Sequence, residues 1–182
     1  EEGDPAYIRT FADKGDDAVC VECHKAKGNY GFQDVGFSEW QASVHAAEGT
    51  GCLSCHKGHK AVNPEKACVT CHAESVAQFQ LPSHHPVREG KMACASCHNP
   101  HGATSDWQFA QQTLNQTCFD CHAEKRGPYL WEHAPAAEDC GNCHNPHGSN
   151  YPGMLTMRGP MLCQSCHSQA GHPSVATDAS GL

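Results

Sequence analysis

The chain has 182 residues, 38% of them hydrophobic, and a formal net charge of −8 at pH 7 with histidine counted as neutral. An acidic chain of this kind is not expected to bind nucleic acid, and no apolar run in it is long enough to form a transmembrane helix. The low hydrophobic content also predicts that the chain cannot fold around an ordinary hydrophobic core.

The regular elements predicted along the chain are few, and all of them are helices. A serine cap followed by good helix formers predicts the first helix over residues 38–47. Pro64 is suited to the first turn of a second helix, which is expected to run on towards Gln80. A third, short helix is expected within residues 105–116, and no alternation typical of a β-strand is present.

All 14 cysteines of the chain belong to seven Cys-x-x-Cys-His motifs. The cysteine pairs are Cys20 and Cys23, Cys52 and Cys55, Cys68 and Cys71, Cys94 and Cys97, Cys118 and Cys121, Cys140 and Cys143, and Cys163 and Cys166. The histidines that follow them directly are His24, His56, His72, His98, His122, His144 and His167. In such a motif two thiols form thioether bonds to haem and the histidine becomes the proximal iron ligand. The sequence therefore predicts seven covalently attached haems c.

Other cysteine chemistry fits the pattern less well. Zinc sites, iron–sulfur clusters and disulfides use cysteines at similar spacing, but none of them requires a histidine directly after the second cysteine. A thioredoxin-like redox pair would need a βαβ pattern around one motif, which is not visible. Haem attachment is therefore the favoured interpretation, and folding is expected to depend on it.

Eight further histidines are candidate distal ligands of the haem irons: His45, His59, His84, His85, His101, His133, His147 and His172. His45 and His133 each lie seven residues before a motif, and His59, His101 and His147 each follow a motif histidine by three residues. Seven irons need seven distal ligands, so bis-histidine ligation is predicted throughout, with one histidine in excess. Which of His84, His85 and His172 is not a ligand stays open at this point.

The spacing of the histidines also predicts an internal repeat. The two Asn-Pro-His-Gly tetrapeptides, at 99–102 and 145–148, are expected to form tight turns. The predicted fold is a multihaem cytochrome c with a few short α-helices and loops around an elongated stack of haems, and with no β-sheet. We expect one domain over residues 1–182, built from two-haem repeats at about 37–80, 81–127 and 128–173.

Several longer segments resemble one family of multihaem cytochromes. They are Leu-Pro-Ser-His-His-Pro at 81–86 with Glu-Gly-Lys-Met at 89–92, Gly-Pro-Tyr-Leu-Trp-Glu-His-Ala-Pro at 127–135, and Arg-Gly-Pro-Met-Leu-Cys-Gln-Ser-Cys-His at 158–167. Together they resemble the periplasmic decahaem cytochromes of porin–cytochrome conduits (the MtrA/DmsE type), in a shortened, seven-haem version. The pentahaem donor of the periplasmic nitrite reductase is a further relative. The resemblance implies an electron carrier partly enclosed by an outer-membrane porin.

Electron transfer is the function that these features predict, from a quinol-linked periplasmic donor to an outer-membrane or extracellular acceptor. A surface multihaem cytochrome is the partner expected beyond the porin. The alternatives are a subunit of an extracellular cytochrome filament formed by self-association, a soluble periplasmic shuttle to a terminal reductase, and a reductase with one open haem iron. Haem is attached to these motifs outside the cytoplasm, so the expected location is periplasmic, outer-membrane-associated or extracellular, with an export signal that this chain does not carry.

Overall fold

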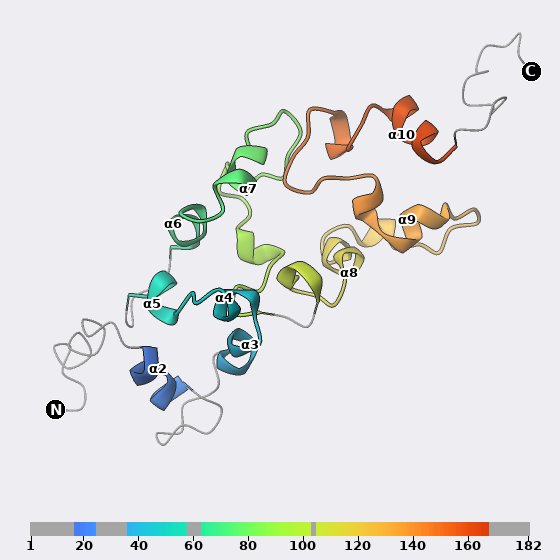
Figure 1. The fold of residues 1–182 in the computed structure, drawn as a ribbon. Helices are drawn as coiled ribbons and strands as arrows, with labels where there is room; N and C mark the ends of the chain where they lie inside the picture. The colour runs from blue at the N-terminus through green and yellow to red at the C-terminus, as the bar shows by residue number, and fades with distance from the viewer. Residues whose placement is uncertain (1–16, 25–35, 58–62, 103–104, 168–182) are drawn as a thin grey trace, which may run out of the picture. The chain divides into compact units, whose positions relative to one another are not determined.

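The computed structural model describes residues 17–24, 36–57, 63–102 and 105–167 (Figure 1). Its α-helices are α2 (Asp17–His24), α3 (Phe37–Gln41), α4 (Val44–Ala47), α5 (Cys52–Cys55), α6 (Pro64–Val69), α7 (Ala73–Gln78), α8 (Leu114–Phe119), α9 (Ala134–Glu138) and α10 (Gly159–Cys166). Five short 3₁₀-helices lie between them: η1 (Cys94–Ser96), η2 (Asp106–Gln108), η3 (Ala123–Lys125), η4 (Cys140–Asn142) and η5 (Pro152–Met154).

Loops and turns connect these short helices, and the part of the chain that the structure describes contains no β-strand. Three isolated β-bridges join Ser83 with Ser149, His98 with Phe109, and His144 with Leu155. None of the described helices combines the length and the apolar character needed to cross a membrane. The predicted fold class of short helices and loops without a sheet is confirmed.

The predicted helix over residues 38–47 is two helices in the structure. Ser43 lies between α3 and α4 in an extended conformation, and its hydroxyl accepts a hydrogen bond from the Ala46 backbone amide at 3.3 Å. A serine in this role starts a new helix rather than continuing the old one. The predicted cap at Ser38 was wrong, because Gly36 occupies the N-cap position of α3.

The other two predicted helices are also divided or displaced. The helix expected from Pro64 towards Gln80 begins as predicted, with Asn63 as its cap, but it is interrupted between α6 and α7. The helix expected within 105–116 begins only at α8, where the Thr113 hydroxyl accepts from the Gln116 amide at 3.2 Å. Both helices begin before a cysteine motif and end one residue after its first cysteine, α6 after Cys68 and α8 after Cys118.

Packing within the described residues is polar. No hydrophobic side chain that the structure describes is buried, and the buried side chains are those of Ser43, Asn115, Thr117 and Ser149. Leu130 and Trp131 are 95% and 92% exposed. A polypeptide that buries so little apolar surface lacks the main driving force for folding. This agrees with the expectation that the chain depends on an attached cofactor.

The chain divides into two units, each formed by two separate segments. The first contains the described residues up to His72 together with Ala93–Cys121, and the second contains Ala73–Met92 together with the described residues from His122 onwards. In the first unit α3 contacts α4, α5 contacts α2 and α6, and α6 contacts η1, while in the second α9 contacts η4. The single domain built from three two-haem repeats stays a prediction.

The chain produced without haem attachment is expected to show no cooperative unfolding transition. The described residues bury no hydrophobic side chain of their own, so the haem-free polypeptide has little folded structure that heating could unfold. Circular dichroism during thermal unfolding would compare the haem-free chain with the haem-loaded chain, which should unfold in a sigmoidal transition. A sigmoidal transition of similar midpoint in the haem-free chain would contradict this prediction.

Candidate haem-binding sites

Each Cys-x-x-Cys-His motif coincides with a short helical turn. In five motifs the backbone amide of the histidine donates to the carbonyl oxygen of the first cysteine at 2.8 to 3.0 Å, as it does in the motifs of His56, His72, His98, His144 and His167. Residues three and four positions apart lie on the same face of a helical turn. The turn therefore directs both thiols and the imidazole towards one side, which suits attachment to a single porphyrin.

Four of the motif histidines lie next to a histidine from another part of the chain. The ring centres are 6.1 Å apart for His45 and His72, 6.0 Å for His56 and His101, 6.3 Å for His85 and His122, and 6.1 Å for His133 and His167. Every pair joins a predicted proximal ligand to a predicted distal candidate. The first two pairs lie in the first unit and the last two in the second.

The separation of these rings fits an iron between them. A transition metal binds an imidazole nitrogen at about 2.0–2.1 Å, and the ring centre lies roughly 1.1 Å beyond that nitrogen, so two opposite imidazoles place their ring centres about 6.3 Å apart. The four observed distances, 6.0 to 6.3 Å, agree with this value. Two thiols and two imidazoles at each such position form a complete donor set for one haem c.

Hydrogen bonds to oxygen acceptors fix the tautomer of several of the predicted ligands. The acceptors of the Nδ1–H groups are Pro100 O for His45 (3.1 Å), Pro146 O for His85 (2.7 Å), Trp107 O for His98 (2.9 Å), Gly153 O for His144 (2.7 Å) and Gln78 Oε1 for His147 (3.1 Å). These oxygens only accept, so in each ring Nδ1 carries the proton and Nε2 carries the lone pair that can bind a metal.

The two Asn-Pro-His-Gly segments form the predicted turns and connect several of these histidines. In the first copy the Asn99 side chain accepts from the His101 amide at 3.1 Å, and Pro100 supplies the carbonyl that holds His45. The His101 ring is also the partner of His56. One turn therefore orients candidate ligands that belong to two different motifs.

The glycine that ends each turn lies against backbone from elsewhere in its unit. A Cβ atom on Gly102 would lie 2.6 Å from the Glu39 carbonyl oxygen, and one on Gly148 would lie closer still to the Gln78 carbonyl oxygen. Both distances are shorter than van der Waals contact allows, so neither position has room for a side chain. The turns can approach these carbonyls only with glycine.

His84 and His85 differ sharply although they are neighbours. Nδ1 of His84 is hydrogen-bonded to Leu81 O at 2.5 Å, and Nε2 of the same ring is hydrogen-bonded to the Glu89 carboxylate at 3.2 Å. That hydrogen bond holds the pKa of the Glu89 carboxyl below its usual value. Both ring nitrogens of His84 are thus engaged with acceptors, whereas His85 faces His122. Of these two neighbours, His85 therefore has the surroundings expected of a distal ligand, and its ligation stays a prediction.

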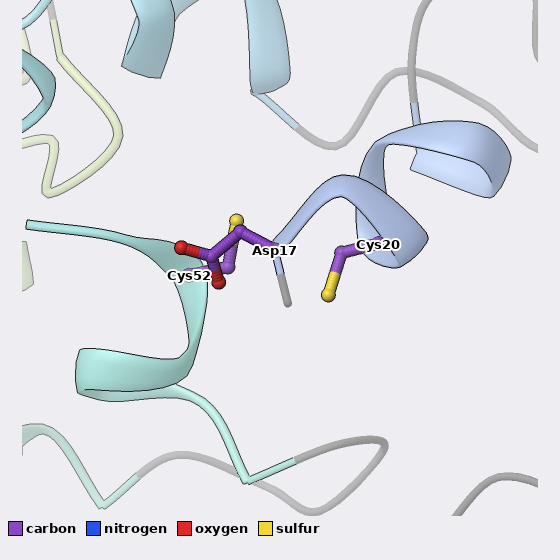
Figure 2. Close-up of side chains that lie close together, drawn as sticks. All are labelled: Asp17, Cys20 and Cys52. Carbon is purple, nitrogen blue, oxygen red and sulfur yellow. The ribbon is translucent and has the colours of Figure 1, made fainter. Parts of the chain in front are cut away.

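Thiols of successive motifs lie close together in the first unit. Asp17, Cys20 and Cys52 place one ligand atom each within 4.8 Å of one another, and Figure 2 shows the three side chains between α2 and the start of α5. Burial raises the pKa of the Cys52 thiol to about 11, with further contributions from Asp17 and Cys20. Cys20 and Cys52 begin the first two motifs, so this cluster belongs to the haem-attachment sites and not to a separate metal site.

The same relationship continues along the first unit. Burial raises the pKa of the Cys68 thiol, and the neighbouring thiols of Cys94 and Cys55 raise it further. The pKa of the Cys97 thiol is likewise raised by burial and then by Cys121. These thiols come from motifs two to five, so motifs two, three and four each have a sulfur near a sulfur of the next motif along the chain.

The second cysteines of the third and first motifs, Cys71 and Cys23, are two further predicted attachment sites. Cys71 is exposed, unlike the half-buried Cys68 of the same motif, and its amide donates to Cys68 O at 3.2 Å. An exposed thiol is accessible to a haem vinyl group, so Cys71 stays a proposed attachment site. The backbone of Cys23 belongs to α2, but its side chain lies outside the part of the chain that the structure describes. Haem attachment at Cys23 therefore stays a prediction.

Some predicted site residues have other surroundings or lie outside the described residues. His147 lies against Phe79, with ring centres 5.2 Å apart. His24 is half-buried on α2. His59 and His172 lie outside the described residues. Sequence reasoning missed the carbonyl groups of Pro100, Pro146, Trp107 and Gly153, although the repeated Asn-Pro-His-Gly segment was a signal for the first two.

Comparison with known proteins agrees with haem binding at the Cys-x-x-Cys-His motifs. Residues 84–127 and 133–172 match the family model described as a doubled CXXCH motif. The chain is a multihaem c-type cytochrome. Over 174 residues, 92% of its length, this cytochrome is 42% identical to the multihaem cytochrome MtrA of Shewanella baltica, of which it spans 50%.

Two weaker similarities point to the same class of protein. The cytochrome is 27% identical to the polyhaem cytochrome OmcB of Geobacter sulfurreducens over 85% of its own length and 20% of that protein. It is 29% identical to the c-type cytochrome NrfB of Escherichia coli over 60% of its length and 67% of that protein. The cytochrome thus spans about half the length of its relative MtrA.

Substitution of Gly102 by alanine is expected to destabilise the haem-loaded cytochrome by about 1–3 kcal/mol more than substitution of Gly49. Both glycines have a positive φ, 114° and 74°, but a Cβ at Gly49 meets nothing within 4 Å. Gly49→Ala therefore measures the cost of the left-handed backbone alone. Thermal unfolding of the two variants would test this, and equal losses in stability would contradict the close approach of Gly102 to Glu39.

Proposed function

We propose that this cytochrome carries electrons through seven bis-histidine c-type haems between a quinol-linked periplasmic donor and an outer-membrane or extracellular acceptor. The observation that carries the proposal is the set of four histidine pairs with ring centres 6.0 to 6.3 Å apart. When bound, the haem irons would supply reversible one-electron oxidation and reduction. The residues of the chain hold, orient and saturate those irons.

The proposed covalent attachment sites are the seven cysteine pairs, and the proposed proximal ligands are the seven histidines that follow them. For four haems the structure also supports a distal ligand: His101 opposite His56, His45 opposite His72, His85 opposite His122, and His133 opposite His167. His59, His147 and His172 are proposed as the remaining distal ligands. His84 is left out because Leu81 and Glu89 engage both of its nitrogens.

This choice balances the number of ligands against the number of irons. Removing His84 from the eight candidates leaves seven distal histidines for seven irons. An iron held by a porphyrin and two imidazoles has no open position for a substrate, and its ligands need not change when its oxidation state changes. Both consequences favour an electron carrier over a reductase.

The proposed partners follow from the relatives and from the charge of the chain. Identity of 42% to MtrA over most of the chain supports a place in a porin–cytochrome conduit, in which an outer-membrane porin and a surface multihaem cytochrome would be the partners. The similarity to OmcB, a second polyhaem cytochrome, supports electron transfer through several haems. The formal charge of −8 favours redox partners with a basic docking surface. A periplasmic or outer-membrane-associated location is proposed accordingly.

Mass spectrometry and electron paramagnetic resonance together test this function. The purified protein is expected to carry seven covalent haems, and the oxidised form is expected to show only low-spin signals. Nitrite added to the oxidised form should leave the resonance spectrum unchanged, and carbon monoxide added to the reduced form should leave the optical absorption spectrum unchanged, because no iron has an open position. A high-spin haem that binds these ligands would favour a reductase, and a lower haem count would overturn the assignment of seven sites.

The assignment of His85 predicts a sharp difference between two neighbouring substitutions. His85→Ala should open the iron held by His122, producing one high-spin haem and carbon monoxide binding by one haem in the reduced protein. His84→Ala should leave every haem low-spin, because His84 is engaged by Leu81 and Glu89. Resonance spectra of the two variants would decide, and a high-spin haem in His84→Ala alone would reverse the assignment.

A further inference from the structure

His98 and His144 lie in two copies of one local structure, one copy in each unit. Both imidazoles donate from Nδ1 to the carbonyl oxygen nine residues later, Trp107 O at 2.9 Å and Gly153 O at 2.7 Å. In each copy an isolated bridge then joins the histidine with the residue two positions beyond that carbonyl. Because the same contacts recur 46 residues further along the chain, they form a repeated structural motif and are not specific to one loop.

The backbone around the accepting carbonyl is held in place from both sides. The Asn99 amide donates to Gln108 O at 2.7 Å and the Ala110 amide donates to Cys97 O at 2.8 Å. In the second copy the Asn145 amide donates to Met154 O at 2.8 Å, and the Thr156 amide donates to Cys143 O at 2.9 Å. The carbonyl that meets the imidazole is therefore fixed relative to the motif that carries the imidazole.

Two consecutive residues in each copy have left-handed backbone conformations. The φ angles are 60° and 52° for Trp107 and Gln108, and 68° and 57° for Gly153 and Met154. Residues other than glycine adopt this region at an energetic cost, and they keep it where the surrounding structure requires it. The Trp107 indole is 81% exposed and Gly153 has no side chain, so burial of a side chain does not explain the conformation.

We propose that Trp107 and Gly153 are positioning residues whose carbonyl oxygens orient the His98 and His144 imidazoles and lower the reduction potentials of the two irons that these histidines hold. A hydrogen bond from Nδ1 to a carbonyl makes an imidazole a more basic ligand, and a more basic ligand favours the ferric iron. The left-handed turn directs that carbonyl oxygen towards the imidazole. The inference rests on the proposed role of His98 and His144 as proximal ligands.

Gly153 offers a test that separates the conformation of the turn from steric clash. A Cβ at Gly153 would meet nothing within 4 Å, so the first atom of a new side chain has space. Valine strongly resists a positive φ, whereas asparagine tolerates it. Gly153→Val should therefore turn the carbonyl away from His144, and Gly153→Asn should leave it in place.

Spectropotentiometry of the haem-loaded protein should show one reduction step of Gly153→Val shifted to higher potential, with the other steps unchanged. Gly153→Asn should superimpose on the unsubstituted protein, and so should Trp107→Gly, which keeps the carbonyl and removes the strain. Electron paramagnetic resonance should show that the affected haem stays low-spin with altered g-values. Gly153→Ala, which resists the turn less strongly, provides a smaller shift in the same direction if Gly153→Val is poorly produced.

Two results would overturn the inference while leaving the proposed function intact. Unshifted potentials in both Gly153→Val and Gly153→Ala, with all haems attached and low-spin, would show that the carbonyl does not tune the iron. Equal shifts in Gly153→Val and Gly153→Asn would assign the effect to the added side chain. Absence of a haem on the motif of Cys140 and Cys143 in the unsubstituted protein, found by mass spectrometry of its peptides, would instead overturn the proposed function itself.

Discussion

The rest of this structure depends on the pairing of imidazole rings from distant parts of the chain. In each pair the ring centres lie about 6 Å apart. Elsewhere in proteins a hydrophobic core brings distant segments together, but no hydrophobic side chain in the described residues is buried. Ligand bonds and thioether bonds are strong and directional, so a few of them can replace a large buried surface. The short helices then need only to present the ligands, which explains why none of those described exceeds eight residues.

The sequence predicted the chemistry of this protein better than the positions of its helices. Seven motifs with a histidine directly after the second cysteine identify a c-type cytochrome because no other cysteine site requires that order. Helix boundaries depend on capping, and the caps that the structure uses, Ser43 and Thr113, lie inside segments that were predicted as single helices. The break between α6 and α7 falls where the third motif ends.

Backbone acceptors explain what the sequence could not predict about the site. The sequence alone does not distinguish His84 from its neighbour His85. In the structure, Leu81 O and the Glu89 carboxylate engage both ring nitrogens of His84. Pro146 O engages only Nδ1 of His85, which leaves Nε2 available. Carbonyl groups exist at every residue, so composition and spacing give no signal for the one that meets an imidazole. The left-handed conformations at Trp107 and Gly153 could not be predicted from the sequence either, because tryptophan and glycine share no conformational preference.

The hydrogen bonds of the histidines also suggest how the proposed sites would keep both axial ligands on each iron. Nδ1 of His45 and of His85 is held by the proline carbonyl of an Asn-Pro-His-Gly turn, and in the first turn the next residue, His101, faces His56. Displacing that turn would therefore disturb the surroundings of two irons together. Because Gly102 and Gly148 seat the two turns against backbone, a local shift in either ligand is resisted by the packing of its whole turn. In the proposed bis-histidine sites, such coupling would keep both ligands in place as an iron changes oxidation state, which is the property that an electron carrier needs and that a reductase has to give up at one site.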